Sequence, residues 1–169
     1  SAQEFNALFK QVYDNGKINY FRLTENSHGH DFPTEEITVG KGIVAREGTD
    51  VTVAVTGAQL RNARSAAEQL EAKGTSVELL YFHTLKPFDN SLLRQSIKKT
   101  RKLLSVEELS AHDGLFNLCL RASAGINDLQ VKQLAIEDFI SGYGSYSELC
   151  SKVGLNVEGI ISAILHLAD

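Results

Sequence analysis

The sequence contains no methionine or tryptophan, and only two cysteines and two prolines among its 169 residues. Cys119 and Cys150 lie far apart, and Cys119 falls within an apolar helical pattern. We therefore expect buried thiols in a reducing compartment, rather than ligands or nucleophiles. Because the chain has no methionine and begins with Ser1, we expect a piece of a longer chain, a processed product or a replaced leader.

Basic clusters and long apolar runs are also missing. Lys and Arg number 17 against 21 Asp and Glu, a net charge of −4, and they are scattered along the chain. Without a basic stripe to neutralise phosphates, we expect no nucleic-acid partner. No apolar run approaches the ~20 residues that cross a bilayer, and no basic start precedes an apolar core. We expect a cytoplasmic protein with no membrane partner.

Strand and helix patterns alternate from Gly40 onward. Val51–Val55 alternates valine with uncharged Thr52 and Ala54, which is typical of a strand covered on both faces. Such alternating units predict an α/β domain with a mostly parallel sheet. The predicted strands are 42–46, 51–56, 76–82, 102–107 and 131–136, and the predicted helices are 58–73, 89–100, 114–124, 145–152 and 156–167.

The N-terminal residues follow a different pattern. Residues 2–14 place apolar side chains at helical spacing, and Ile18–Leu23 has the composition of a strand. Residues 24–38 are polar and have no period, so we expect a linker and a domain boundary there. His28-Gly29-His30-Asp31, in this stretch, is the one local cluster of metal-friendly side chains, but we interpret it as part of a solvated linker.

Candidate chemistry lies where the parallel strands end, because ligands of open α/β sheets bind beyond that edge. This rim would carry Gly57, His83, Thr84, Glu107, Glu108 and Asp138. A histidine among carboxylates could transfer protons or hold a metal. However, Thr84 and Asp89 are typical turn and cap residues, and acidic residues after a strand often meet the next helix N-terminus. We favour this second interpretation and expect no catalytic, cofactor-binding or metal-binding residue.

We interpret two further segments as structural features and not as ligand-binding loops. The turn Thr56–Leu60 lacks the repeated glycines of dinucleotide-binding loops. Gly142–Tyr146 is predicted to be a turn in which Ser145 caps the next helix, and Asn156 is predicted to cap the last helix.

A set of motifs spread over every unit resembles the C-terminal domain of transketolase-like thiamine-diphosphate enzymes. The residues that carry the resemblance are Gly40–Val44, Glu47–Thr52, Leu85–Asp89, Val106–Glu108, Gly114, Gly154–Leu155 and Ile160. The resemblance covers about residues 38–168. It implies a three-layer α/β/α sandwich with a five-stranded, mostly parallel sheet in which one strand is antiparallel. It further implies that residues 38–169 are this domain and residues 1–37 are the tail of a preceding pyrimidine-binding domain with its linker.

The same resemblance implies a role for the chain. In this family two upstream domains hold thiamine diphosphate and Mg²⁺, so this chain is expected to bind no cofactor and to have those domains as partners. Its contribution would be to contacts in a homodimer or hetero-oligomer, to the active-site rim, or to subunit docking. Two alternatives stay open: a stand-alone interaction module of the same fold, and a regulatory domain binding a small ligand near Thr56 and Glu108.

The substrate class depends on one departure from the family pattern. Transketolase, deoxyxylulose-phosphate synthase and the β subunit of 2-oxo-acid dehydrogenases are the possible parents. Phosphosugar members have an Arg-x-x-Arg pattern whose second Arg meets the substrate phosphate, whereas this chain has Arg22-Leu-Thr-Glu25. A carboxylate there replaces a charge-assisted pair with repulsion, which favours the dehydrogenase subunits and a non-phosphorylated substrate. The segment Gly142–Gly154 instead resembles the transketolase tail. Arg22 and Glu25 are the substrate-channel candidates.

Overall fold

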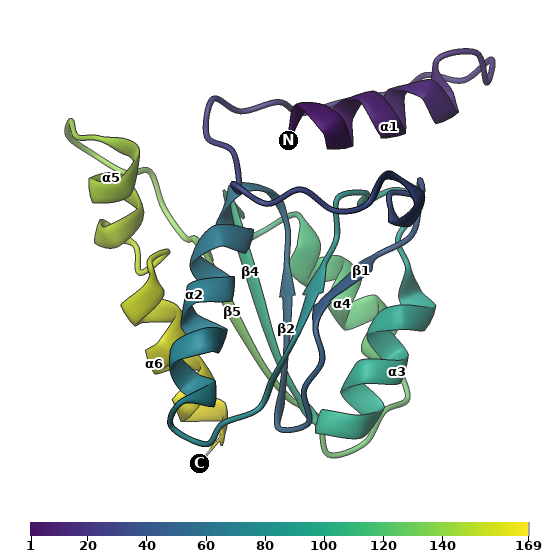
Figure 1. The fold of residues 1–169 in the computed structure, drawn as a ribbon. Helices are drawn as coiled ribbons and strands as arrows, with labels where there is room; N and C mark the ends of the chain where they lie inside the picture. Colours follow the sequence, from purple (N-terminus) through teal and green to yellow (C-terminus); the bar gives the residue numbers. More distant parts are fainter. Residues whose placement is uncertain (169) are drawn as a thin grey trace.

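Five strands form one sheet in the order β1-β3-β2-β4-β5 (Figure 1). The strands are β1 Ile43–Arg46, β2 Val51–Val55, β3 Val77–Tyr81, β4 Lys102–Ser110 and β5 Gln130–Ile136. Strands β2 to β5 run parallel, and β1 pairs antiparallel with β3. The computed structural model describes residues 1–168, so Asp169, the last residue of the predicted 38–169 domain, lies outside the described residues. The predicted mostly parallel five-stranded sheet is confirmed.

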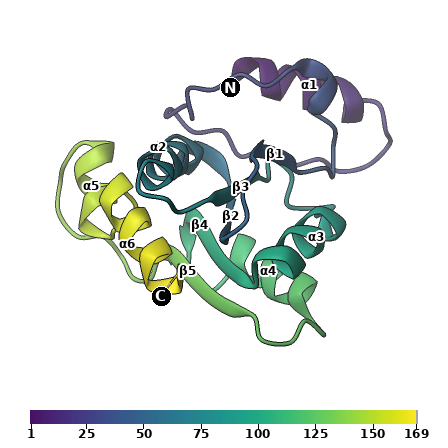
Figure 2. The same cartoon turned by 60° about the horizontal axis from the view of Figure 1, so that its bottom comes forward.

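Helices cover both faces of this sheet (Figure 2). Helices α2 Leu60–Glu71 and α6 Val157–Ala168 pack on one face, and α3 Asn90–Thr100 and α4 Leu115–Ser123 pack on the other. A shorter helix, α5 Tyr146–Lys152, precedes α6. The three-layer α/β/α sandwich is thereby confirmed. Within residues 1–168, no helix is both long enough and apolar enough to cross a membrane.

The central strand β2 is completely buried, as its sequence predicts. Val53 and Val55 join the core beneath α2 and α6, whereas Ala54 joins the core beneath α3 and α4. Successive side chains of a strand point to opposite faces, so an uncharged run can fill both cores. On α2 the buried residues include Ala63, Ala66 and Ala67, whose small side chains let the helix approach the sheet closely.

The motifs Gly40-Lys-Gly42 and Leu85–Asp89 contact each other in the fold. A Cβ on Gly42 would lie 2.7 Å from atoms of Leu92 and Phe82. The Asp89 carboxylate accepts hydrogen bonds from the N–H of Gly42 at 3.3 Å and of Leu92 at 3.1 Å, so it caps α3 as predicted. Burial alone would raise the pKa of Asp89, but hydrogen bonds from Ser91, Leu92 and Gly42 hold it below its usual value.

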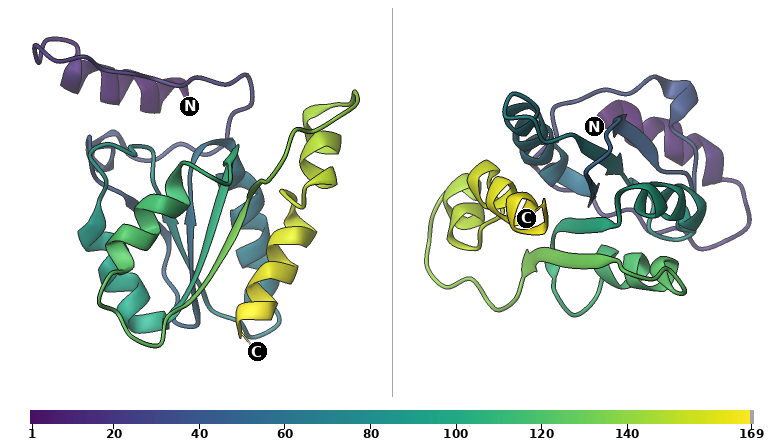
Figure 3. Two further views of the ribbon diagram at one scale, coloured as in Figure 1. Left: turned by 180° about the vertical axis from the view of Figure 1, so that it is seen from behind. Right: turned by 90° about the horizontal axis from the view of Figure 1, so that it is seen from below.

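Residues 1–37, which we call the N-terminal arm, lie across the carboxyl ends of the parallel strands, while the C-terminus lies at the opposite end (Figure 3). The arm contains α1 Ala2–Val12 and the 3₁₀ turn η1 Thr34–Glu36. The predicted helix over 2–14 is confirmed and ends slightly earlier. The predicted strand over Ile18–Leu23 is wrong: the segment is largely exposed, and no strand within residues 1–168 pairs with it. A strand exists only through its ladder, so strand composition alone does not suffice.

The expected linker packs against the sheet domain. Its His28, Phe32 and Ile37 are buried, and the Phe32 ring stacks on Tyr81 with ring centroids 5.5 Å apart. The amide of Gln11 donates to the Ile37 carbonyl at 2.7 Å. The interpretation of His28 as part of a solvated linker is therefore wrong, because apolar residues at irregular spacing anchor the segment.

Candidate functional site

The parallel strands end in a rim with one topological switch point. From β2 the chain continues to β3, which lies toward one edge of the sheet. From β4 it continues to β5, which lies at the other edge. The loops that follow β2 and β4 therefore diverge, and ligands of open α/β sheets bind in the crevice that this divergence opens.

Glu107 is fully buried in the second half of β4 and caps the next helix. Its carboxylate accepts hydrogen bonds from the N–H of Leu115 at 2.8 Å and of Phe116 at 3.0 Å, at the positive end of α4. Gly114 immediately precedes α4, with φ 137° and ψ −146°. The predicted cap interpretation is confirmed for Glu107, whose oxygens are already engaged by the backbone.

Glu108 has different hydrogen-bond partners from those of Glu107. It accepts a hydrogen bond from the Tyr146 phenol on α5, and Gln59 Nε2 donates to the same phenol oxygen at 3.1 Å. Burial first, and then the bond to Glu108, raises the pKa of Tyr146. The Gln59 amide also lies 3.6 Å from Cys150 Sγ. This chain of contacts ties α5 to the ends of β2 and β4.

Both cysteines are buried free thiols, as predicted. Burial is the main cause that raises the pKa of Cys119 and of Cys150. A thiol that stays protonated is a poor nucleophile and a poor metal ligand.

His83 lies beyond β3 with one ring nitrogen engaged. Its Nδ1 is 2.9 Å from Thr84 Oγ1, while Nε2 is buried without a hydrogen-bond partner among residues 1–168. Burial lowers the pKa of His83, and the nearby charge of Glu4 opposes this effect. The ring is therefore neutral near pH 7. Asp138 is exposed and accepts from the Phe139 N–H, so the structure does not gather all the predicted rim residues into one site.

A polar cluster that the sequence did not predict joins the arm to the sheet. Tyr81 Oη donates to Glu4 Oε1 at 3.1 Å, and His28 Nε2 lies 3.5 Å from Glu4 Oε2. Burial alone would raise the pKa of Glu4, but the contacts with His28 and Tyr81 hold it below its usual value. The one sequence feature that pointed to this cluster was Glu4, which lies one helical turn before the apolar Leu8 and so on the same face of the helix. Its partners lie 24 and 77 residues away along the chain, beyond the reach of local patterns.

The two histidines of the arm serve different partners. His30 Nε2 lies 3.0 Å from Arg64 Nη1 on α2, whereas His28 faces Glu4. Across the described part of the chain, no three His, Cys, Asp or Glu side chains gather as metal ligands. Arg22 and Glu25, the predicted channel residues, are both exposed on the arm, and their role stays a prediction.

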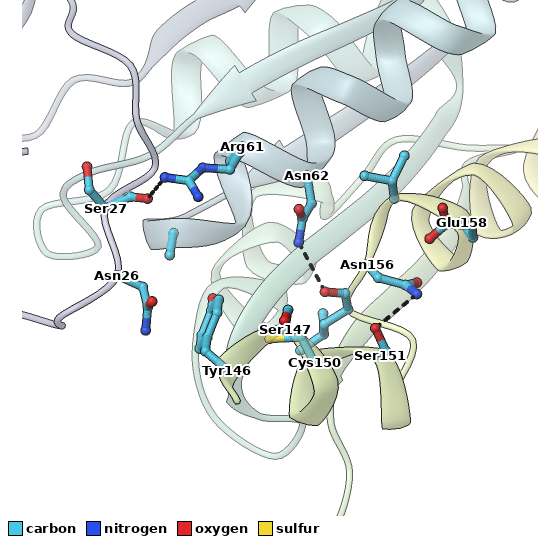
Figure 4. Close-up of a pocket in the computed structure, with 13 residues that line it drawn as sticks. Asn26, Ser27, Arg61, Asn62, Tyr146, Ser147, Cys150, Ser151, Asn156 and Glu158 are labelled. Carbon is cyan, nitrogen blue, oxygen red and sulfur yellow. Dashed lines mark hydrogen bonds between the residues drawn. The ribbon is translucent and has the colours of Figure 1, made fainter. Parts of the chain in front are cut away.

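A cavity of about 200 Å³ lies beside the switch point (Figure 4). Its walls come from arm residues 26–27, from the start of α2 and from the α5–α6 region. Arg61 Nη2 donates to the Ser27 carbonyl at 2.8 Å, and Asn62 Nδ2 donates to the Leu155 carbonyl at 3.1 Å. Hydrogen bonds thus hold the three walls together. Nearby, Ser145 and Asn156 cap α5 and α6 as predicted.

Comparison with known sequences finds a family match over most of the chain. The family described as transketolase, C-terminal domain, matches residues 40–160. The 6-deoxy-6-sulfo-D-fructose transketolase subunit SqwH of Clostridium sp. (strain MSTE9) is 30% identical over 161 residues, 95% of this chain and 50% of that protein. The 1-deoxy-D-xylulose-5-phosphate synthase of Shouchella clausii (strain KSM-K16) is 29% identical over 159 residues, 92% of this chain and 25% of that protein. The chain spans half or less of these relatives.

Solved transketolase structures also match this chain. A structure described as a split gene transketolase, inactive beta4 tetramer, matches with a TM-score of 0.72 at 28% identity, over 78% of this chain and 43% of that one. A transketolase mutant from Pichia stipitis matches with a TM-score of 0.58 at 18% identity, over 80% of this chain and 19% of that one, and shows a shared fold.

Replacing Gly114 tests the contact between Glu107 and α4. In Gly114→Ala the new Cβ would lie 2.2 Å from Glu107 Oε2, at a backbone conformation reserved for glycine. We expect a loss of about 2–4 kcal/mol in the free energy of unfolding, measured with denaturant. Gly74→Ala is the matched control, because Gly74 has φ +88° but open space around its Cβ position. It should cost about 1–2 kcal/mol. Equal losses in the two variants would contradict the proposed steric cause.

The burial of His83 predicts a pH dependence of stability. Its folded-state pKa lies below the unfolded value of 6.5, so the unfolded chain takes up the proton first. Stability is therefore complete above that pH and falls as pH drops below it, by up to about 1.4 kcal/mol per pH unit. His83→Gln should flatten this slope between neutral pH and the acid range.

His30→Gln is the control for this experiment, because the pKa of His30 is also lowered while its ring is less buried than that of His83. We expect it to flatten the slope less. An unchanged slope in His83→Gln would mean that other groups control the acid response.

Proposed function

Because this chain belongs to the transketolase C-terminal domain family, we propose that it is the C-terminal part of a longer, thiamine-diphosphate-dependent transferase of the transketolase type. The observation that carries the proposal is the match to the SqwH subunit, which takes in 95% of this chain but 50% of the relative. The matching family is described as a C-terminal domain. We therefore place the other half of such a relative upstream of the matching part.

We assign the cofactor to that upstream part. The residues of this chain do not fit a thiamine diphosphate and magnesium site, because the rim carboxylates already have partners. Glu107 accepts two backbone N–H groups, and Glu108 accepts the Tyr146 phenol. Magnesium prefers carboxylates that are free to complete an octahedral oxygen shell. The contribution of this chain is to dimer contacts and to the rim of the active site.

The N-terminal arm is our proposed junction with the preceding pyrimidine-binding domain. The SqwH match covers 161 of 169 residues, so at most 8 residues lie outside it and most of the arm is included. Half of the ten exposed large hydrophobic side chains lie between residues 9 and 23: Phe9, Tyr13, Ile18, Tyr20 and Leu23. This concentration of exposed apolar side chains on one short segment is what we expect of a surface that contacts another domain. An upstream sheet would also supply the ladder that Ile18–Leu23 lacks here.

Titration calorimetry with thiamine diphosphate and Mg²⁺ tests the assignment of the cofactor. We expect no binding by this chain alone, and binding when the chain is mixed with the upstream segment of its parent. Binding by the isolated chain would overturn the assignment. Absence of binding in both cases would favour an interaction module of the same fold.

The substrate proposal depends on Arg22 and Glu25. We propose that the parent enzyme uses a substrate without a phosphate, because a carboxylate at position 25 repels a second anion. The names of the two relatives differ here: that of the SqwH subunit includes a sulfo-sugar, which is also anionic, and that of the Shouchella relative includes a phosphate.

Charge reversal at position 25 tests this proposal in the intact enzyme. Glu25→Arg should raise kcat/KM for a phosphorylated sugar relative to its unphosphorylated analogue by about tenfold, the equivalent of 1.4 kcal/mol. Asp14→Arg makes the same charge change elsewhere on the arm and should leave the ratio unchanged. Equal ratios in Glu25→Arg and wild type would remove Glu25 from the substrate channel.

A further inference from the structure

The cavity beside the start of α2 has features of a ligand site that the proposed transferase function does not use. Tyr146 lines it, and the Tyr146 phenol is bonded to Glu108 of β4 and to Gln59 before α2. The cavity therefore lies at the carboxyl end of the sheet, on the side covered by α2 and α6. Ligands of open α/β sheets bind at this end of the sheet.

The walls of the cavity are held in place before any ligand arrives. Arg61 fixes arm residue Ser27, and Asn62 fixes Leu155 at the start of the α5–α6 connection. The pocket does not need to assemble on binding, so the ordering cost of association is reduced.

Hydroxyl and amide side chains dominate the polar lining. The residues of this kind are Asn26, Ser27, Asn62, Ser147, Ser151 and Asn156. Several polar groups remain available: no hydrogen bond within residues 1–168 uses the Asn26 amide, Asn62 Oδ1 or the Glu158 carboxylate. Amides and hydroxyls both donate and accept, so they match a ligand that carries several hydroxyl groups.

The charges of the lining cancel. The guanidinium of Arg61 and the carboxylate of Glu158 come from different walls, α2 and α6, and lie apart in Figure 4. A strongly anionic ligand would meet Glu158, and a cationic ligand would meet Arg61. At about 200 Å³ the cavity is smaller than the ~300–1,000 Å³ typical of drug-sized ligands. This volume suits an occupant about the size of a monosaccharide better than one the size of a nucleotide.

We infer that this cavity binds a small, uncharged, polyhydroxylated molecule of the free-sugar class. The ligand bridges the arm, α2 and the α5–α6 region, so its binding fastens the arm to the sheet domain. This inference is independent of the transferase proposal, because it requires neither the cofactor nor the upstream domains.

Amide-resolved NMR titration of the 169-residue chain with D-ribose tests the inference. We expect saturable shifts at Asn26, Asn62 and Glu158, with a dissociation constant on the order of 1 mM. D-ribose 5-phosphate should bind no more tightly than D-ribose, because attraction of the phosphate to Arg61 and repulsion by Glu158 oppose each other. Absence of saturation with D-ribose, shifts confined to other parts of the chain, or tighter binding of the phosphate by the wild type would each overturn the inference.

Two variants sharpen the test. Asn26→Ala removes an exposed amide and should weaken D-ribose binding by about threefold or more, the effect of one lost hydrogen bond. Glu158→Gln keeps the shape of the side chain, leaves Arg61 as the one charge of the lining, and should raise the affinity for D-ribose 5-phosphate relative to D-ribose. Gln95→Ala, on α3 at the opposite face of the sheet, is the control and should change neither affinity. Unchanged binding in Asn26→Ala, or unchanged discrimination in Glu158→Gln, would contradict the site.

Discussion

The complete burial of β2 is the constraint on which the rest of this structure depends. A parallel strand at the centre of a sheet has neighbours on both edges and must be covered by helices on both faces. Val53 and Val55 require α2 and α6, and Ala54 requires α3 and α4. Once both faces are covered, only the two ends of the sheet remain for loops. The carboxyl end collects the arm, the capped helix starts and the cavity.

At that end, polar side chains mainly hold segments of the chain together. Asp89 joins the Gly42 segment to α3, and Glu107 caps the N-terminus of α4. Glu108 holds α5 in place through the Tyr146 phenol. The carboxylates of Asp89, Glu107 and Glu108 are thus committed to backbone N–H groups or to a phenol. This commitment agrees with the proposal that the cofactor is held by another part of the protein.

The arm has two surfaces of opposite character. Toward the sheet it presents Glu4, His28 and Phe32, which meet Tyr81 through hydrogen bonds and ring contacts. Elsewhere on the arm Tyr13, Tyr20 and other apolar side chains are exposed. A segment that is specifically docked on one side and apolar on the other is suited to connect two bodies. This agrees with its proposed place between an upstream domain and this one.

The sequence by itself determined the fold class, the order of the strands and helices from Gly40 onward, and the caps at Asp89, Ser145 and Asn156. These features follow from local periodicity and from turn and cap chemistry, and both act over a few residues. Only the tertiary structure decided that Ile18–Leu23 has no strand partner, that His28 is buried, and that Glu4 meets Tyr81. It also decided that a cavity opens between the arm, the start of α2 and the α5–α6 region. Contacts between residues far apart in sequence decide these features, and no local pattern encodes such contacts.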